Sequence, residues 1–238
     1  MERDLKYPRT YHLPNSLSLQ NDDRRIPSLL AYKGRRLRAT EKLDGEGTTQ
    51  TRTKTYPRSP DGRPHPSRNW MKAHHARKAH DIPEGWRISG EYMYALHSIP
   101  YTNANSNALR SYFYAFGVWN ADNVLLGVDE ADEIYQMLDM EPAPVLYDGP
   151  YYDGLIEELA AGIDPQRQEG FVLRDAGPIP YPEGRGDAGR FFSATADRPG
   201  LAKWVRSRHV ATDEHWMSNW RDAPGFVNEL LPGCSPVP

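Results

Sequence analysis

The chain turns sharply at Glu41-Lys42-Leu43-Asp44-Gly45, between strands predicted over residues 36–42 and 48–56. A lysine at a strand end, followed by Asp and Gly, directs its amine over a turn whose backbone a ligand can approach closely. Such an amine acts as a covalent nucleophile only when it is neutral. Taken alone, the same stretch is equally consistent with a surface lysine beside a tight polar turn.

Outward from this turn, strands outnumber helices and do not alternate with them regularly. Further strands are predicted at residues 86–95, 111–119, 145–147, 170–174 and 202–205. Helices are predicted at residues 67–80, 129–138, 151–161 and 213–231, and a Pro- and Gly-rich loop at residues 177–190. This order favours an α+β fold with antiparallel sheets over a doubly wound fold.

Length and composition fit one domain over residues 1–238, with residues 207–238 as a short C-terminal appendage. The 238 residues are 38% hydrophobic and 26% charged, which is enough to build a core. No apolar run approaches the roughly 20 residues that a membrane helix needs, so no membrane association is expected. Cys234 is the only cysteine, which excludes disulfides within the chain and favours a reducing cytoplasm.

Charge is distributed unevenly along the chain. Residues 1–110 carry 20 basic and 11 acidic side chains, whereas residues 111–166 carry 12 acidic side chains and no Lys or Arg. Only 7 of the 29 cationic residues are lysines. We expect the basic segment to face a polyanion and the acidic segment to form a solvated outer face away from it.

Charged or aromatic residues recur at the edges of the later strands. They lie in Ser89-Gly90-Glu91-Tyr92, in the aromatic strand that includes Phe116, in Glu169-Gly170-Phe171-Val172-Leu173, and in Ala202-Lys203-Trp204-Val205. Together with Lys42 they supply a nucleophilic amine, two carboxylates suited to a hard metal ion or ribose, a ring for base stacking, and a second amine for phosphate.

In this order the motifs resemble those of the covalent nucleotidyltransferases, which are polynucleotide ligases and messenger-RNA capping enzymes. They are most similar to ATP-dependent RNA ligases of the RNA ligase 2 type. The opening block, from Tyr7-Pro8-Arg9-Thr10 to Asn21-Asp22-Asp23-Arg24, resembles a compact group of stand-alone bacterial and phage RNA ligases. The resemblance covers residues 7–217.

The resemblance implies an adenylyltransferase domain whose antiparallel sheets flank an ATP cleft, with helices at the periphery. It implies three steps: a lysine of the enzyme takes AMP from ATP, the AMP passes to a 5′-phosphate RNA end, and a 3′-hydroxyl displaces it. Magnesium or manganese is the expected metal. The implied partners are RNA ends, with an end-healing kinase or phosphatase as a further partner, and a monomer is expected.

Four catalytic residues follow from the resemblance. Lys42 is the implied nucleophile. Glu91 holds the ribose or a metal-bound water, and Glu169 helps to bind the divalent ion. Lys203 contacts the α-phosphate of ATP, and its charge is expected to lower the pKa of Lys42.

Nucleotide-binding roles are implied for a second group. Glu41 borders the adenine pocket, Asp44 and Gly45 form the turn beside the nucleotide, and Phe116 stacks on adenine. Arg58 contacts ribose or the 5′-phosphate of RNA.

Two departures from the family pattern leave alternatives open. The family often has a second lysine two residues after the position of Lys203, where this chain has Val205. Arg206 is a candidate substitute, although in a regular strand it points to the opposite face. The region after Lys203 is also short. A DNA ligase, a GTP-using capping enzyme and a non-sealing module that binds nucleic-acid ends are therefore retained as alternatives.

Overall fold

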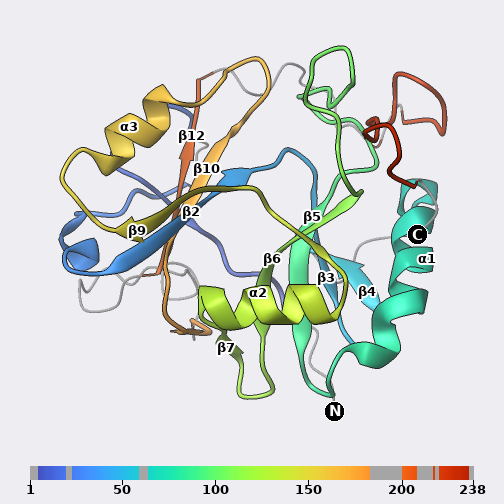
Figure 1. Cartoon of the computed structure of the whole chain (residues 1–238), viewed down its shortest axis with the longest axis horizontal. Coiled ribbons are helices and arrows are strands. Elements are labelled where there is room, and N and C mark those ends of the chain that lie inside the picture. The colour runs from blue at the N-terminus through green and yellow to red at the C-terminus, as the bar shows by residue number, and fades with distance from the viewer. Residues whose placement is uncertain are drawn as a thin grey trace.

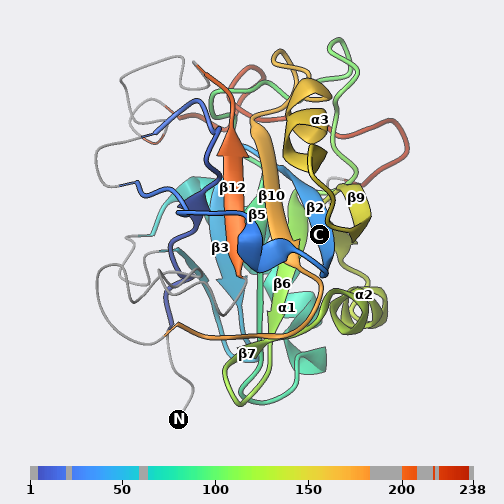
Figure 2. The same ribbon diagram turned by 90° about the vertical axis from the view of Figure 1, so that its left-hand side faces the viewer.

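The computed structural model describes residues 5–19, 23–58, 64–182, 200–207, 217 and 220–235. Two β-sheets lie next to each other and are joined by the turn that carries Lys42 (Figures 1 and 2). This arrangement confirms the predicted α+β fold with predominantly antiparallel sheets.

The first sheet has five strands within the described residues. Their order is β1 (Tyr11–His12), β12 (Leu201–Val205), β10 (Gly170–Asp175), β2 (Arg36–Lys42) and β9 (Val145–Pro150). All neighbours are antiparallel except β1 and β12. One face packs on a core that includes Leu37, Phe171 and Leu173, each fully buried.

The second sheet has seven strands in the part of the chain that the structure describes. Its path is β11 (Ile179–Pro180), β7 (Val124–Leu125), β6 (Phe113–Trp119), β5 (Arg87–Tyr92), β3 (Glu46–Gln50) and β4 (Thr55–Pro57), and β8 (Glu141–Pro142) pairs with β6. Its core includes Ile88, Met93 and Val118.

Helices lie around the sheets, as predicted (Figure 1). They are α1 (Asn69–Lys78), α2 (Val128–Met137) and α3 (Leu155–Ala161), with short 3₁₀ turns at Leu30–Tyr32, Pro66–Arg68 and Ala79–Asp81. α1 and α2 contribute side chains to the core of the seven-stranded sheet, and α3 to that of the five-stranded sheet. Among the described residues, no helix has the length and apolar character needed to cross a membrane.

Two predicted elements were wrong. The strand predicted over residues 48–56 is split into β3 and β4, because Thr51 closes a turn by accepting the N–H of Lys54 on its side-chain oxygen.

The helix predicted over residues 213–231 is absent from residues 220–231, whose backbone instead bonds to a preceding loop. Leu96 N–H donates to the Phe226 carbonyl and Leu109 N–H to the Glu229 carbonyl. Residues 213–216, 218 and 219 lie outside the described part.

The predicted loop at residues 177–190 contains the short strand β11, which pairs with β7. Its residues 183–190 lie outside the described part of the chain.

Candidate active site

The register of the five-stranded sheet shows which residues share its inner face, the face opposite to the core. Lys42 lies beside Gly170, which lies beside Val205, and two residues back Thr40, Val172 and Lys203 form a second row. Arg38, Arg174 and Leu201 form a third row. Because side chains alternate between the faces of a strand, all these residues face the same side, opposite to the core. The sheet thus places Lys42 and Lys203 on one surface, on either side of β10.

A β-bulge in the seven-stranded sheet directs Phe116 toward this surface. Ser89 pairs with Gly117 and Gly90 pairs with Ala115, so Phe116 has no partner on β5. A bulge of this kind breaks the alternation of side chains and re-aims one of them. As a result, the consecutive residues Ala115 and Phe116 both line the same cavity.

Between the two sheets lies a cavity of about 480 Å³. Eight of the ten residues expected to form the site line it: Glu41, Lys42, Gly45, Arg58, Glu91, Phe116, Glu169 and Lys203. Asp44 and Arg206 are not among its lining residues. The strands and loops that supply these eight residues are far apart in the sequence. The fold therefore brings into one cavity residues whose motifs are only known to follow one another along the chain.

Lys42 forms an ion pair with Glu169 in this cavity. The Nζ atom of Lys42 lies 2.5 Å from Oε2 of Glu169, whose side chain is only 5% exposed. Burial by itself lowers the pKa of Lys42, but the carboxylates of Glu169 and Glu91 outweigh burial and hold that pKa above its ordinary value. Repulsion from Lys203, which is expected to lower the pKa of Lys42, does not bring that pKa below its ordinary value here.

Glu91 is the carboxylate most strongly affected by burial in the cavity. Burial raises the pKa of Glu91 to about 8, and the neighbouring charges of Lys42 and Glu169 act in opposite directions. Burial likewise raises the pKa of Glu41, whose Oε2 accepts a hydrogen bond of 3.1 Å from Gln168 Nε2.

Glycine is required at two positions beside these carboxylates. A Cβ atom on Gly45 would lie 2.6 Å from both the Tyr92 carbonyl oxygen and Met93 Sδ. A Cβ atom on Gly170 would lie 2.0 Å from the Trp204 carbonyl oxygen. The two glycines therefore allow the Lys42 turn and strand β10 to pack closely against their neighbours.

Asp44 and Arg206 are engaged with the protein backbone. Oδ2 of Asp44 accepts the N–H groups of Ser98 and Ile99, each at 2.8 Å. Nε of Arg206 donates to the Gln168 carbonyl oxygen at 2.9 Å. The inward position two residues after Lys203 is occupied by Val205, which lines the cavity.

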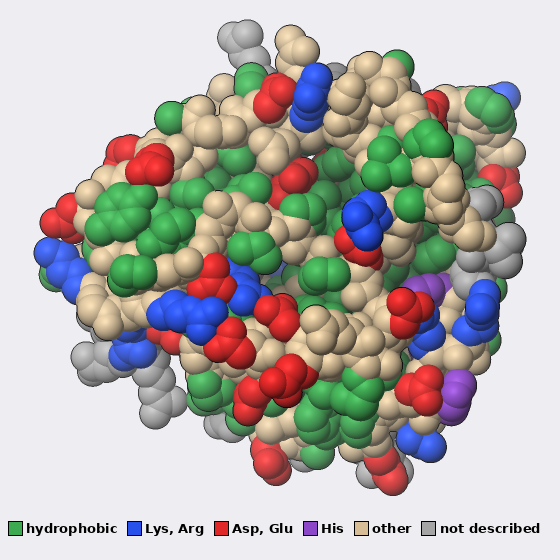
Figure 3. All heavy atoms as spheres, viewed as in Figure 1, with side chains coloured by type: hydrophobic (Ala, Val, Ile, Leu, Met, Phe, Trp, Pro, Cys, Tyr) green, Lys and Arg blue, Asp and Glu red, His purple; other side chains and the backbone are tan. Residues whose placement is uncertain are grey.

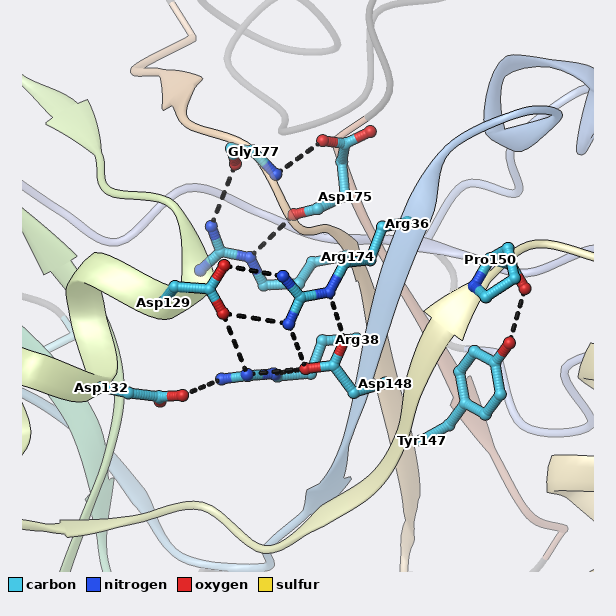
Figure 4. A network of polar contacts seen from close by, with 10 residues as sticks. All are labelled: Arg36, Arg38, Asp129, Asp132, Tyr147, Asp148, Pro150, Arg174, Asp175 and Gly177. Carbon is cyan, nitrogen blue, oxygen red and sulfur yellow. Dashed lines mark hydrogen bonds and ion pairs between the residues drawn. The ribbon is translucent and has the colours of Figure 1, made fainter.

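Arg36 and Arg38 of the basic segment contact acidic residues of α2 and β9 (Figure 4). Arg36 bonds to Asp129 and Asp148, and Arg38 bonds to Asp132 and Asp148, at N–O distances of 2.6–2.7 Å. Figure 3 shows the resulting mixture of basic and acidic side chains over this region.

The acidic segment is therefore not only a solvated outer face, since part of it neutralises two arginines. Asp132 also lines the cavity. The sequence separations between partners, such as 110 residues for Arg38 and Asp148, explain why charge counting along the chain missed the pairing.

The family model for RNA ligase matches residues 35–191, more than half of the chain. The chain belongs to the RNA ligase family. No curated protein sequence matches it at a significant level.

Solved structures with the same fold include an RNA ligase and a putative ATP-dependent DNA ligase. The Naegleria gruberi RNA ligase with PPi is 19% identical, with a TM-score of 0.50 over 87% of this chain and 59% of that one. A variant of that ligase with ATP and Mn is 15% identical, with a TM-score of 0.50 over 84% of this chain and 61% of that one.

A putative ATP-dependent DNA ligase from Aquifex aeolicus is 14% identical, with a TM-score of 0.53 over 84% of this chain and 50% of that one. This RNA ligase family member thus spans between half and about three fifths of the length of the ligases it matches.

The N-terminal segment contributes residues to this family member's cavity that sequence reasoning did not single out. They include Tyr7, Arg9, His12 and Asp23, none of which was given a role in the site from the sequence. The ring of Tyr7 meets that of Phe116 edge-on, with 5.0 Å between centroids. Resemblance to a compact ligase group drew attention to this block, but no local pattern in it predicts contact with strands more than 90 residues away.

Proposed function

We propose that this protein is an ATP-dependent RNA ligase that carries AMP on Lys42. The observation that carries the proposal is the position of Lys42. Its amine lies in a cavity whose lining includes the Glu91 and Glu169 side chains, a second lysine and the ring of Phe116, in a chain of the RNA ligase family. An amine, a base-stacking ring and cationic phosphate contacts are what covalent nucleotide transfer requires.

In the first step, Lys42 passes its ammonium proton to the Glu169 carboxylate that it contacts, and the neutral amine then donates its electron pair to the α-phosphorus of ATP. The bond from that phosphorus to the oxygen bridging to the β-phosphate breaks, pyrophosphate leaves with the electron pair, and the attacking nitrogen loses a proton. Lys203 faces the same cavity and is proposed to contact the α-phosphate. Most of the catalysis then comes from positioning and from neutralising charge, as is general for phosphoryl transfer.

The adenine is proposed to bind between the two sheets. Phe116 lines the cavity from the seven-stranded sheet and Val172 from the five-stranded sheet. An aromatic face and an apolar side chain on opposite walls suit a flat base. Glu41, a partly buried residue whose carboxyl accepts a hydrogen bond from Gln168, is proposed to border the base.

Magnesium or manganese fits the donors that line the cavity. Mg²⁺ is usually held by one or two carboxylates, several waters and the substrate phosphates. Glu91 and Glu169 supply two carboxylates, and the described residues contain no cluster of three or more metal-binding side chains. A bound divalent ion would supply positive charge to the phosphate oxygens.

In the second step, a 5′-phosphate oxygen of RNA attacks the phosphorus of the lysyl-AMP. The nitrogen–phosphorus bond breaks and the lysine amine is restored with a proton. In the third step, a 3′-hydroxyl attacks the 5′-phosphorus of the RNA, and AMP leaves as the phosphodiester forms. Arg9 and Arg58, both exposed and both lining the cavity, are proposed to bind RNA phosphate.

The test is covalent labelling with ATP that carries ³²P at the α-phosphate, in the presence of Mg²⁺. Wild-type protein should retain label after denaturation, and Lys42→Ala should not. Lys33→Ala is the matched control, because the Lys33 side chain is 55% exposed and does not line the cavity. Equal labelling of wild type and Lys42→Ala would overturn the assignment.

Substrate class is tested by sealing nicked duplexes with RNA or DNA on each side of the nick. Sealing that requires RNA at the nick supports the proposal, whereas equal sealing of all-DNA nicks would make the protein a DNA ligase. Labelling by GTP in preference to ATP would indicate capping chemistry. RNA binding without sealing, even of a pre-adenylylated 5′ end, would indicate an end-binding module.

A further inference from the structure

Strand β12, which carries Lys203, is hydrogen-bonded along its outer edge to the N-terminal segment. β1 runs parallel to β12 and places His12 beside Lys203. The Leu13 N–H donates to the Lys203 carbonyl oxygen at 2.8 Å, and the Leu17 N–H donates to that of Val205 at 2.9 Å. The backbone of the N-terminal segment therefore fixes the position of residues 12–17 relative to Lys203.

A chain of side-chain contacts runs through this segment. Ser16 Oγ accepts the Val205 N–H at 3.0 Å and lies 2.8 Å from His12 Nδ1. On the other side of the ring, His12 Nε2 lies 3.0 Å from Asp23 Oδ2. His12 is fully buried, so water does not compete for these contacts.

The protons in this chain can be assigned. Burial, followed by the charge of Lys203, lowers the pKa of His12 to about 4, so the ring is neutral at pH 7. A carboxylate only accepts protons in hydrogen bonds, so the single ring proton lies on Nε2, the nitrogen that faces Asp23 Oδ2. Nδ1 then accepts the hydroxyl proton of Ser16. The Ser16 hydroxyl and His12 Nδ1 are both satisfied in this arrangement, and the 3.0 Å contact of Nε2 with Asp23 Oδ2 orients the carboxylate of Asp23.

The second oxygen of that carboxylate faces Lys203. Asp23 Oδ1 lies 3.6 Å from Lys203 Nζ, and the two side chains are 15% and 23% exposed. The charged groups that act on Lys203 are Lys42 and Arg58, which repel it, and Asp23 and Glu169, which attract it. Glu169 is already paired with Lys42 at 2.5 Å, so Asp23 is the carboxylate that holds Lys203.

We propose that His12 and Asp23 are positioning residues for Lys203: His12 orients the carboxylate of Asp23, and Asp23 holds the Lys203 amine where the α-phosphate of ATP binds. The inference rests on the proposed function, because it takes Lys203 as the phosphate contact. A lysine side chain has four flexible methylene groups, and fixing its amine before the nucleotide arrives removes an entropic cost from the reaction. Without the tether, repulsion from Lys42 and Arg58 would displace the amine.

The first test is Asp23→Asn, which keeps the shape of the side chain and an oxygen that accepts from His12 but removes the charge facing Lys203. We expect the rate of lysyl-AMP formation at saturating ATP to fall about tenfold, within the range seen for coupled neighbours. The ATP concentration at half-maximal rate should change little, because the lost interaction acts in the transition state. Asp23→Glu should recover part of the rate. Asp153→Asn, at a side chain that is 82% exposed, is the matched control.

A double-mutant cycle separates positioning from a general effect on the fold. In a Lys203→Met background, Asp23→Asn should cause no further loss, because no amine remains to be held. His12→Gln, which keeps a donor near the position of Nε2, should be less impaired than His12→Asn, which does not. Thermal unfolding of each variant establishes that it is folded.

The outcomes distinguish the two proposals. If wild type is labelled and Asp23→Asn reduces the rate by the same factor with and without Lys203, positioning is overturned and the ligase proposal stands. If folded Asp23→Asn reacts like wild type, positioning is likewise overturned. If wild type is never labelled, the proposed function fails and this inference fails with it.

Discussion

Oδ2 of Asp44 lies 2.8 Å from the backbone nitrogen of Ile99 and accepts its N–H. The same oxygen accepts the N–H of Ser98, and the Asp44 N–H donates to the Tyr101 hydroxyl at 3.1 Å. The residue two positions after the proposed nucleophile therefore ties the Lys42 turn to the loop at residues 98–101. The contacts of Asp44 therefore hold the turn in place.

Replacement of Asp44 by Ala should destabilise the protein by about 1–3 kcal/mol, since two backbone N–H groups lose their acceptor. Asp44→Asn keeps one oxygen and should lose less. Urea unfolding of the two variants measures the difference. If Asp44→Ala unfolds at the same urea concentration as wild type, the two hydrogen bonds contribute nothing to stability.

Gly45→Ala should reduce both stability and lysyl-AMP formation. The added methyl group would meet the Tyr92 carbonyl and Met93 Sδ at 2.6 Å, so the turn must shift, at a cost of about 1–3 kcal/mol. Gly162→Ala is the control, because its nearest contact would be an ordinary 3.5 Å. The measurements are thermal unfolding and the labelling rate; equal rates for Gly45→Ala and wild type would contradict the prediction.

Phe116→Ala should weaken the use of ATP. Stacking of a base on an aromatic ring contributes about 1–3 kcal/mol, so the ATP concentration at half-maximal labelling should rise about tenfold or more. Phe116→Trp retains an aromatic face and should be less affected. An unchanged ATP dependence in Phe116→Ala would show that the adenine does not bind against this ring.

His74→Phe should make the protein less sensitive to acid. Burial, then the charges of Lys78, His75 and Arg77, lowers the pKa of His74 to about 4. The unfolded chain, with an ordinary histidine pKa near 6.5, binds more protons between these values, so stability is present above about pH 6.5 and is lost toward pH 4.

The loss attributable to His74 is up to about 3 kcal/mol, and the variant should not show it. Urea unfolding at pH 7 and pH 5 measures the part of this loss that falls in that range, about 2 kcal/mol. The same substitution at His80, whose side chain is 72% exposed, should leave the difference as in wild type. A wild-type pH dependence in His74→Phe would contradict the prediction.

Much of the candidate site could be predicted because its residues occur in short motifs at strand ends. Lys42, Glu91, Glu169 and Lys203 were named from such motifs, and all four line one cavity. Their roles stay predictions until the labelling experiments are done. The fold class was also predictable, since the strands were recognisable from alternation and from aromatic and β-branched residues.

Other features depend on contacts that a single sequence does not record. The bulge at Phe116 arises from how β5 and β6 pair, and a regular strand would place Ala115 and Phe116 on opposite faces. The ion pair of Asp23 with Lys203 joins residues 180 positions apart. The helix predicted at residues 213–231 was wrong because backbone bonds to a distant loop replace helical ones over residues 220–231.

The three rows on the inner face of the five-stranded sheet fix the spacing of the side chains that β2 contributes to the cavity. Arg38, Thr40 and Lys42 stand two residues apart, so the outer two are separated by about 13 Å along the strand. That length is set by backbone hydrogen bonds to β10 and β9, and no side chain of the cavity can alter it. The length of a ligand that reaches from Lys42 to Arg38 is therefore limited by the backbone of the sheet. Deleting two residues of β2 would keep every remaining side chain on its face of the sheet. It would nevertheless shorten the strand, and with it this wall of the cavity, by about 7 Å.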